Sequence, residues 1–167
     1  MIREFNGKMP VVPGSAFVAD TALVIGDVEM GEDSSVWFGS VVRGDVNYIR
    51  IGARTNIQDM TMIHVSSKTH ATILEDEITV GHRVTLHGCH VESRCLIGIG
   101  AILLDGVRVG NNSLVAAGSL LTPGTTIPPR SMVMGAPAKV RRELTDDEIA
   151  YLDRSWRNYV ELKQHYS

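Results

Sequence analysis

The chain has 167 residues, of which 44% are hydrophobic and 21% charged, and this length and composition suit one compact domain spanning residues 1–167. Its formal net charge of -3 excludes the basic surface that nucleic-acid or anionic-membrane binding requires, so neither kind of partner is expected. The sequence has no apolar stretch long enough to cross a bilayer and no signal-peptide pattern near Met1. We therefore expect a cytoplasmic protein whose partners are small molecules or other proteins.

Aliphatic residues recur at every sixth position through most of the chain. A period of six fits neither a helix nor an alternating strand, but it fits a short strand plus a corner, repeated around a coil. Three such sides close a triangle, and stacked triangles pair their backbones about 4.8 Å apart. The pattern predicts an all-β parallel β-helix of hexapeptide repeats over residues 11–140, and the alternative is a β-sandwich with coincidental spacing. The repeated positions are Val12, Val18, Val24, Met30, Val36, Val42 and Tyr48, then Ile51, Ile57 and Ile63, then Val80 and Leu86, and finally Val91, Ile97, Leu103, Val109, Val115, Leu121, Ile127 and Val133.

The period is interrupted twice and then replaced by a helical one. The segment from Val65 to Glu77 breaks it, and the step from Leu86 to Val91 is one residue short. Loops that leave a rigid coil are where function tends to lie. Beyond the coil, a capping box of Thr145 and Glu148 predicts a C-terminal helix over 145–164 that covers apolar surface of the coil. Its apolar face holds Ile149, Leu152, Trp156, Tyr159 and Val160.

Three histidines lie in the coil near these interruptions. His64 directly follows the repeat position Ile63 and His87 directly follows Leu86, so both should lie on one wall, about a rung apart, where they could share one metal ion. His82 precedes His87 by five residues, a stretch that reaches up to about 16 Å, far beyond a Zn–N bond of about 2.0–2.1 Å. If His82 instead points outward, three coils around a threefold axis could each lend it to the next. The spacing thus favours a homotrimer.

The remaining histidines and the two cysteines have no such pattern. His70, His90 and His165 are expected to face solvent, and Cys89 and Cys95 are expected to be buried fillers rather than a disulfide.

Four segments resemble the γ-class carbonic anhydrase-like proteins of the hexapeptide-repeat family, and the short bacterial members in particular. They are VVRGDV at 41–46, IGARTNIQDMTMIHV at 51–65, VGHRVTLHGC at 80–89 and GAPAKVRREL at 135–144. The resemblance implies that the coil is left-handed. It also implies that His64 and His87 bind Zn²⁺ together with His82 of a neighbouring subunit. Further site residues match the family: Arg43 and Asp45 its inter-subunit ion pair, Gln58 the side chain that hydrogen-bonds the metal-bound solvent, and Asn56 and Asp59 the polar positions that orient the site.

The activity that the resemblance implies is the reversible hydration of carbon dioxide to bicarbonate by metal-bound hydroxide. Three neutral ligands leave zinc an open position where water can ionise near neutral pH, as is established for carbonic anhydrases. Fe²⁺ or Co²⁺ could replace Zn²⁺, because imidazole accepts all three. Val46 stands where the family's best-known active member has a glutamate that moves protons, so weak turnover is one expected outcome.

Two other functions are also compatible with the sequence. Hexapeptide acyltransferases share the coil, the trimer and an ending similar to GAPAK, and they use an acyl-coenzyme A with a catalytic loop histidine, a role that His70 could take. A non-catalytic trimeric scaffold, in which the metal only ties chains together, would retain the three coil histidines.

Overall fold

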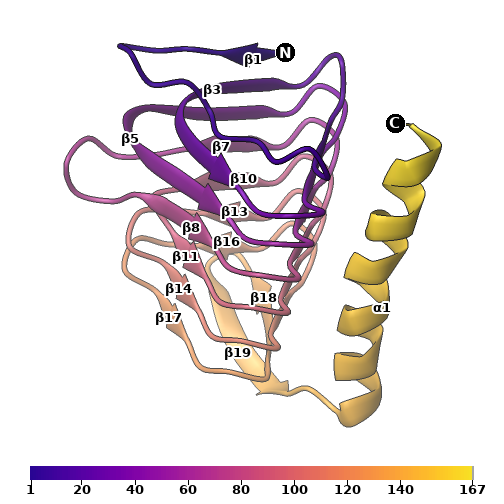
Figure 1. Ribbon diagram of the computed structural model, residues 1–167. Helices are drawn as coiled ribbons and strands as arrows, with labels where there is room; N and C mark the ends of the chain where they lie inside the picture. The colour runs from indigo at the N-terminus through magenta and orange to yellow at the C-terminus, as the bar shows by residue number, and fades with distance from the viewer. Residues whose placement is uncertain (167) are drawn as a thin grey trace.

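The aliphatic positions of the six-residue period build a three-sided coil of stacked strands (Figure 1). The computed structural model describes residues 1–166, which form a parallel β-solenoid of about seven turns followed by one helix. The predicted class, a left-handed parallel β-helix of hexapeptide repeats with a C-terminal helix, is confirmed. No helix among residues 1–166 is both long and apolar enough to cross a membrane.

We number the three walls of the coil in the order in which the chain passes through them from Phe17 onward. Wall 1 stacks β2 (Phe17–Val18), β4 (Ser35–Val36), β6 (Asn56–Ile57), β9 (Thr79–Val80), β12 (Leu96–Ile97), β15 (Leu114–Val115) and β18 (Ser131–Gly135). Wall 2 stacks β1 (Ile2–Arg3), the first halves of β3 (Leu23–Met30) and β5 (Val41–Ile51), and then β7 (Met62–His64), β10 (Thr85–His87), β13 (Ile102–Leu103) and β16 (Leu120–Leu121). Wall 3 stacks the second halves of β3 and β5 on β8 (Thr72–Leu74), β11 (His90–Val91), β14 (Arg108–Val109) and β17 (Thr126–Ile127).

The core is a set of aliphatic ladders inside these walls. In wall 2 the register places Val42, Ile63, Leu86, Leu103 and Leu121 one above another, and all five are fully buried. Parallel pairing satisfies the backbone groups of each strand, so small turns of coil can bury apolar side chains at every level. The side chains that leave each wall at its corners are therefore held on a rigid frame.

Both cysteines are buried in this core as free thiols, as expected. Burial raises the pKa of Cys89 and of Cys95 to about 12, because the apolar surroundings disfavour the thiolate. Neither thiol is therefore a ready metal ligand or nucleophile.

Two parts of the predicted period are wrong in detail. Tyr48 was an expected core position, but it is 39% exposed and Ile49 is buried in its place. The cause is a slip in the β3–β5 register, which pairs Gly26 with Gly44 but Val28 with Ile49, so that residues 45–48 bulge outward. The predicted excursion from Val65 to Glu77 is also shorter, because Val65 is buried and β8 rejoins wall 3 from Thr72. Within this segment, only residues 66–71 leave the coil.

The coil ends in an antiparallel hairpin, and the helix then runs back along the outside toward the N-terminal turns (Figure 1). Strand β19 (Ala138–Glu143) returns along β18 and closes the parallel stack. Helix α1 (Asp146–Leu162) begins with the predicted capping box of Thr145 and Glu148, and the short 3-10 helix η1 (Lys163–His165) follows it. Leu152 and Trp156 are its buried residues, and the Lys163 ammonium binds the Ser15 carbonyl and the Asp33 carboxylate of the first turns.

Candidate metal centre

His64 and His87 lie side by side at the end of wall 2. Strands β7 and β10 pair in parallel with His64 opposite His87, as their equal offsets in the repeat predict. Their ring centroids are 5.2 Å apart, and His64 Nδ1 is 3.2 Å from His87 Nε2. The two imidazoles therefore present one nitrogen each to a common point between neighbouring rungs.

A carboxylate holds the outer nitrogen of each of these rings. His64 Nε2 is 2.9 Å from Asp45 Oδ1, and His87 Nδ1 is 2.7 Å from Asp105 Oδ1. An ionised carboxylate can only accept hydrogen bonds, so both of these ring nitrogens carry the proton and donate. In the neutral imidazoles the facing nitrogens, His64 Nδ1 and His87 Nε2, are then both lone-pair donors, which is the arrangement that a cation requires.

The pKa values of the two carboxyls agree with this assignment. Burial works against ionisation of Asp45, but hydrogen bonds from His64 and Arg43 outweigh it and hold the pKa below its ordinary value of 3.8. Burial likewise disfavours the charged form of Asp105, and hydrogen bonds from Ser66 and His87 overcome it, so this pKa is also lowered. Both groups are therefore carboxylates near neutral pH.

His82 lies at the opposite edge of wall 2, at the corner between walls 1 and 2. Its Nδ1 is 2.7 Å from Asp59 Oδ2, and its side chain is 42% exposed. Within residues 1–166, no three His, Cys, Asp or Glu side chains come together as a group that could hold a metal ion. A single chain thus brings together two of the three predicted ligands and leaves the third exposed elsewhere, as the reach of the chain predicts.

The other predicted site residues fall into two groups. The Arg43 guanidinium is paired with the Asp45 carboxylate within the chain, beside His64. Asn56 is buried on β6 and donates to the Ile78 carbonyl and to Thr79 Oγ1, so its Oδ1 is free to accept a hydrogen bond of 3.2 Å from Gln58 Nε2. This chain of amides fixes the orientation of Gln58.

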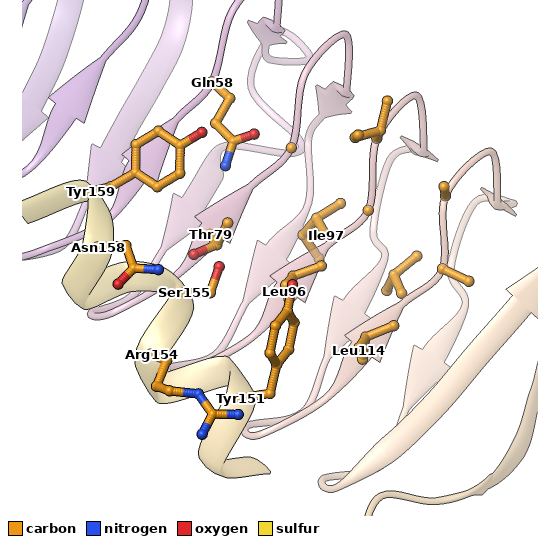
Figure 2. Close-up of a pocket in the computed structure, with 16 residues that line it drawn as sticks. Gln58, Thr79, Leu96, Ile97, Leu114, Tyr151, Arg154, Ser155, Asn158 and Tyr159 are labelled. Atoms are coloured by element: carbon orange, nitrogen blue, oxygen red, sulfur yellow. The ribbon is translucent and has the colours of Figure 1, made fainter. Parts of the chain in front are cut away.

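Gln58 lines a cavity of about 570 Å³ between wall 1 and helix α1 (Figure 2). Gln58 and Tyr159 lie at one end of the cavity, and Tyr151 and Arg154 lie toward the other. Gln58 is 6% exposed, and its Oε1 accepts no hydrogen bond from any residue in 1–166. The cavity thus has a fixed, uncommitted amide carbonyl on a largely apolar wall.

The expected solvent exposure of the remaining histidines is confirmed only for some of them. His70 and His165 are exposed as expected. His90 meets the expectation only in part: it points outward from wall 3, but its side chain is only 23% exposed because its Nε2 lies 3.0 Å from Glu75 Oε1. Asp105 was missed altogether, and the signal that could have found it is its distance of eighteen residues from His87, which is one turn of three hexapeptides.

Wall 2 carries an apolar outer face between its two histidine edges. Its outward positions, in register, are Leu23, Val41, Met62, Thr85, Ile102 and Leu120, of which Thr85 alone is polar. Met62 and Ile102 are 39% and 38% exposed, and the other four are partly exposed. The outward positions of wall 3 include Glu29, Arg50, His90 and Arg108 instead. A row of exposed aliphatic side chains of this kind marks an interaction surface.

Comparison with known proteins agrees with the fold and with the family resemblance of the sequence. Residues 88–123 match the family model described as bacterial transferase hexapeptide (six repeats). The chain is 49% identical to a carbonic anhydrase of Geobacillus kaustophilus over 99% of this chain and 91% of that protein. It is 48% identical to the mitochondrial gamma carbonic anhydrase 1 of Arabidopsis thaliana over 94% of this chain, which spans 59% of that longer protein.

A solved structure gives the same result for the architecture. A hexapeptide transferase family protein from Anaplasma phagocytophilum superposes with a TM-score of 0.95 at 38% identity, covering 99% of this chain and 98% of that one. The chain belongs to the γ-class carbonic anhydrase-like family of hexapeptide-repeat proteins.

Proposed function

We propose that this protein is a homotrimeric, zinc-dependent enzyme that interconverts carbon dioxide and bicarbonate. His64 and His87 of one subunit and His82 of the next would hold the ion, giving three equal sites in the trimer. The kinship with carbonic anhydrases supports the reaction.

The observation that carries the proposal is the pair of facing nitrogens at the end of wall 2. Two ligand nitrogens at about 2.0–2.1 Å from one tetrahedral zinc lie about 3.3–3.4 Å apart. His64 Nδ1 and His87 Nε2 are 3.2 Å apart, and Asp45 and Asp105 occupy the opposite side of each ring. Structural and catalytic zinc histidines are commonly oriented by such carboxylates. The residues present therefore fit zinc, and Fe²⁺ or Co²⁺ would be accepted by the same ligands.

The apolar outer face of wall 2 supports the trimer. His82 lies at one edge of this wall and His64 with His87 at the other. If three copies bury their wall 2 faces around a threefold axis, the edge of each subunit that carries His82 meets the edge of the next subunit that carries His64 and His87. His82, already oriented by Asp59, then supplies the ligand that the first two lack.

A zinc ion with three imidazole ligands keeps an open position and activates water near neutral pH, which is the chemistry established for carbonic anhydrases. Asp45 and Asp59 would orient the ligands His64 and His82, and Arg43 would hold Asp45 in place. Gln58 would accept a hydrogen bond from the hydroxyl of bicarbonate through its free Oε1, with Asn56 fixing the amide. The largely apolar lining of the cavity that contains Gln58 would suit carbon dioxide, which carries no charge.

Metal content and subunit mixing test the site itself. Purified wild type should contain one zinc per chain, and His82→Ala and His64→Ala should each lose it. The control His90→Ala removes a histidine that is also paired with a carboxylate but lies on wall 3, and it should retain the metal. In trimers assembled from equal amounts of His82→Ala and His64→Ala chains, about a quarter of the sites combine two intact edges and should bind zinc again. Recovery of no metal would contradict a site shared between subunits.

Stopped-flow hydration of carbon dioxide tests the activity. Zinc-loaded wild type should exceed the buffer rate, and His82→Ala should not. If stoichiometric zinc gave no rate above buffer, the metal would have a structural role only, as in the scaffold alternative.

The acyltransferase alternative is favoured by one observation, the transferase names of the family model and of the Anaplasma phagocytophilum protein. In that reading His70, exposed on the 66–71 loop, would act on an acyl-coenzyme A. Acetyl-coenzyme A should then raise the melting temperature of metal-free protein, and His70→Ala should abolish transfer.

A further inference from the structure

We propose that Asp105 is a positioning residue that fixes the ring orientation and tautomer of His87, and that Ser66 on the neighbouring loop holds Asp105 in place for this role. The inference rests on the proposed function, because it assigns His87 to a metal, but the contacts that carry it exist in the chain alone.

Each carboxylate oxygen of Asp105 accepts a hydrogen bond from a different side chain. Oδ1 accepts from His87 Nδ1 at 2.7 Å, and Oδ2 accepts from Ser66 Oγ at 2.6 Å. Asp105 comes just after β13 and His87 ends β10, so these two groups are fixed by adjacent turns of the coil. A carboxylate held at both oxygens cannot swing away from the imidazole without breaking a second hydrogen bond.

The loop that carries Ser66 is itself braced. The Ser66 carbonyl accepts a hydrogen bond of 3.0 Å from Asn47 Nδ2, and Ser66 forms a bridge with His70 across the loop. Asn47 belongs to the 45–48 bulge, which also contains the His64 partner Asp45. The two departures from the hexapeptide period thus contribute side chains to the orientation of the two adjacent histidines.

The backbone at Gly88 leaves room for the Asp105 carboxylate. Gly88 has φ +58, and a Cβ at this position would lie only 2.3 Å from Asp105 Oδ1 and 2.7 Å from the His70 Cβ. Any other residue directly after His87 would push the carboxylate away from the ring. The glycine is therefore part of the same device.

The result of this hydrogen bond is that His87 Nδ1 is the donor and Nε2 is left bare, facing His64 Nδ1. Without Asp105 the ring could rotate or take the other tautomer, which would put an N–H where the metal should bind. Outer partners of metal-bound histidines typically change metal affinity by about 10–100-fold when removed.

The test combines zinc affinity with a spectroscopic signature of the ring. Asp105→Ala should weaken zinc binding, measured by competition with a chelator, by about 10–100-fold. Asp105→Asn, which keeps the shape but loses the charge, should have an intermediate effect. The matched control Glu75→Gln alters the His90–Glu75 pair on wall 3 and should leave zinc affinity unchanged.

Nitrogen-15 NMR of the histidine rings in metal-free protein reports the tautomer without any metal or activity. In wild type, His87 should show a protonated Nδ1 and a bare Nε2 at high pH, and Asp105→Ala should shift it toward the mixture found in free imidazoles. If Asp105→Ala fails to fold, Ser66→Ala should show a smaller change in the same direction.

Wild-type zinc affinity and His87 tautomer that persist in Asp105→Ala would overturn the inference while leaving the proposed function intact. Failure of wild type to bind zinc, with the His87 tautomer still dependent on Asp105, would instead overturn the proposed function alone.

Discussion

The most informative single substitution is Gly88→Ala, because an equivalent corner glycine two turns further along, Gly124, provides a matched control. Gly88 and Gly124 both adopt left-handed backbone, with φ +58 and +73, at the corner between walls 2 and 3. A Cβ on Gly88 would meet Asp105 and His70, whereas a Cβ on Gly124 would meet nothing within 4 Å. The two alanine variants therefore share the penalty of the left-handed backbone, and only Gly88→Ala adds a collision.

The magnitude follows from these contacts. The left-handed conformation costs an L-residue about 1–2 kcal/mol, so Gly124→Ala should lose that much unfolding free energy. Gly88→Ala should lose the same amount plus about 1–2 kcal/mol for the displaced hydrogen bond between His87 and Asp105, a modest value because both side chains are about one-third exposed. Zinc affinity should fall about 10-fold or more in Gly88→Ala and stay unchanged in Gly124→Ala.

Urea unfolding of the metal-free proteins and chelator competition for zinc measure both effects. If Gly88→Ala and Gly124→Ala bound zinc with equal affinity, the carboxylate of Asp105 would not depend on the space at Gly88, and the reasoning would fail. Equal stability of the two variants would refute the collision in the same way.

Three further predictions concern the assembly, the core and the charges. Met62→Glu, on the apolar outer face of wall 2, should convert the trimer to monomers in native mass spectrometry, whereas Thr126→Glu on wall 3 should not; a trimeric Met62→Glu would place the interface elsewhere. Leu86→Ala removes a fully buried side chain between Ile63 and Leu103 and should cost about 2–5 kcal/mol in urea unfolding, against less than about 1 kcal/mol for the exposed Leu162→Ala. The pKa of Asp27 in the folded protein lies below its ordinary value of 3.8, chiefly because of the hydrogen bond from Lys8. The ionised carboxylate therefore stabilises the fold at pH values above the pKa of the unfolded chain, and this contribution is lost as the pH falls through the pKa of the folded protein. Asp27→Asn should therefore unfold at lower urea than wild type at pH 7 but at the same urea in acid below both pKa values, and a pH-independent difference would contradict this cause.

Much of the architecture could be predicted from the spacing of residues in the sequence. The main signal for the coil is the aliphatic residue that returns at every sixth position, so the three walls and the stacked ladders could be predicted from spacing. The same arithmetic predicted that His64 and His87 are neighbours, since equal offsets from Ile63 and Leu86 give equal positions on stacked rungs. The helix start at Thr145 is equally local, because a capping box involves residues three apart.

What the sequence could not supply is where the chain departs from its period. Tyr48 has the right spacing for the core, yet a register slip between β3 and β5 expels it and buries Ile49. Nothing in the local sequence shows that residues 72–74 rejoin wall 3, because that depends on which turn can accept another strand. Both features depend on how successive turns pack against one another, which involves residues from all three walls.

The candidate site also combines residues that the sequence predicts with a residue that only the tertiary structure reveals. The identity of the three histidines and of Asp45 and Asp59 could be read from the sequence by its resemblance to a family, but the partner of His87 could not. Asp105 reaches His87 only because stacking of β10 on β13 brings residues from successive turns together and because Gly88 leaves space between them. The sequence determined which rings stand on the coil, and the tertiary structure alone decided which nitrogen of each ring faces its neighbour, because that choice is made by hydrogen bonds across turns.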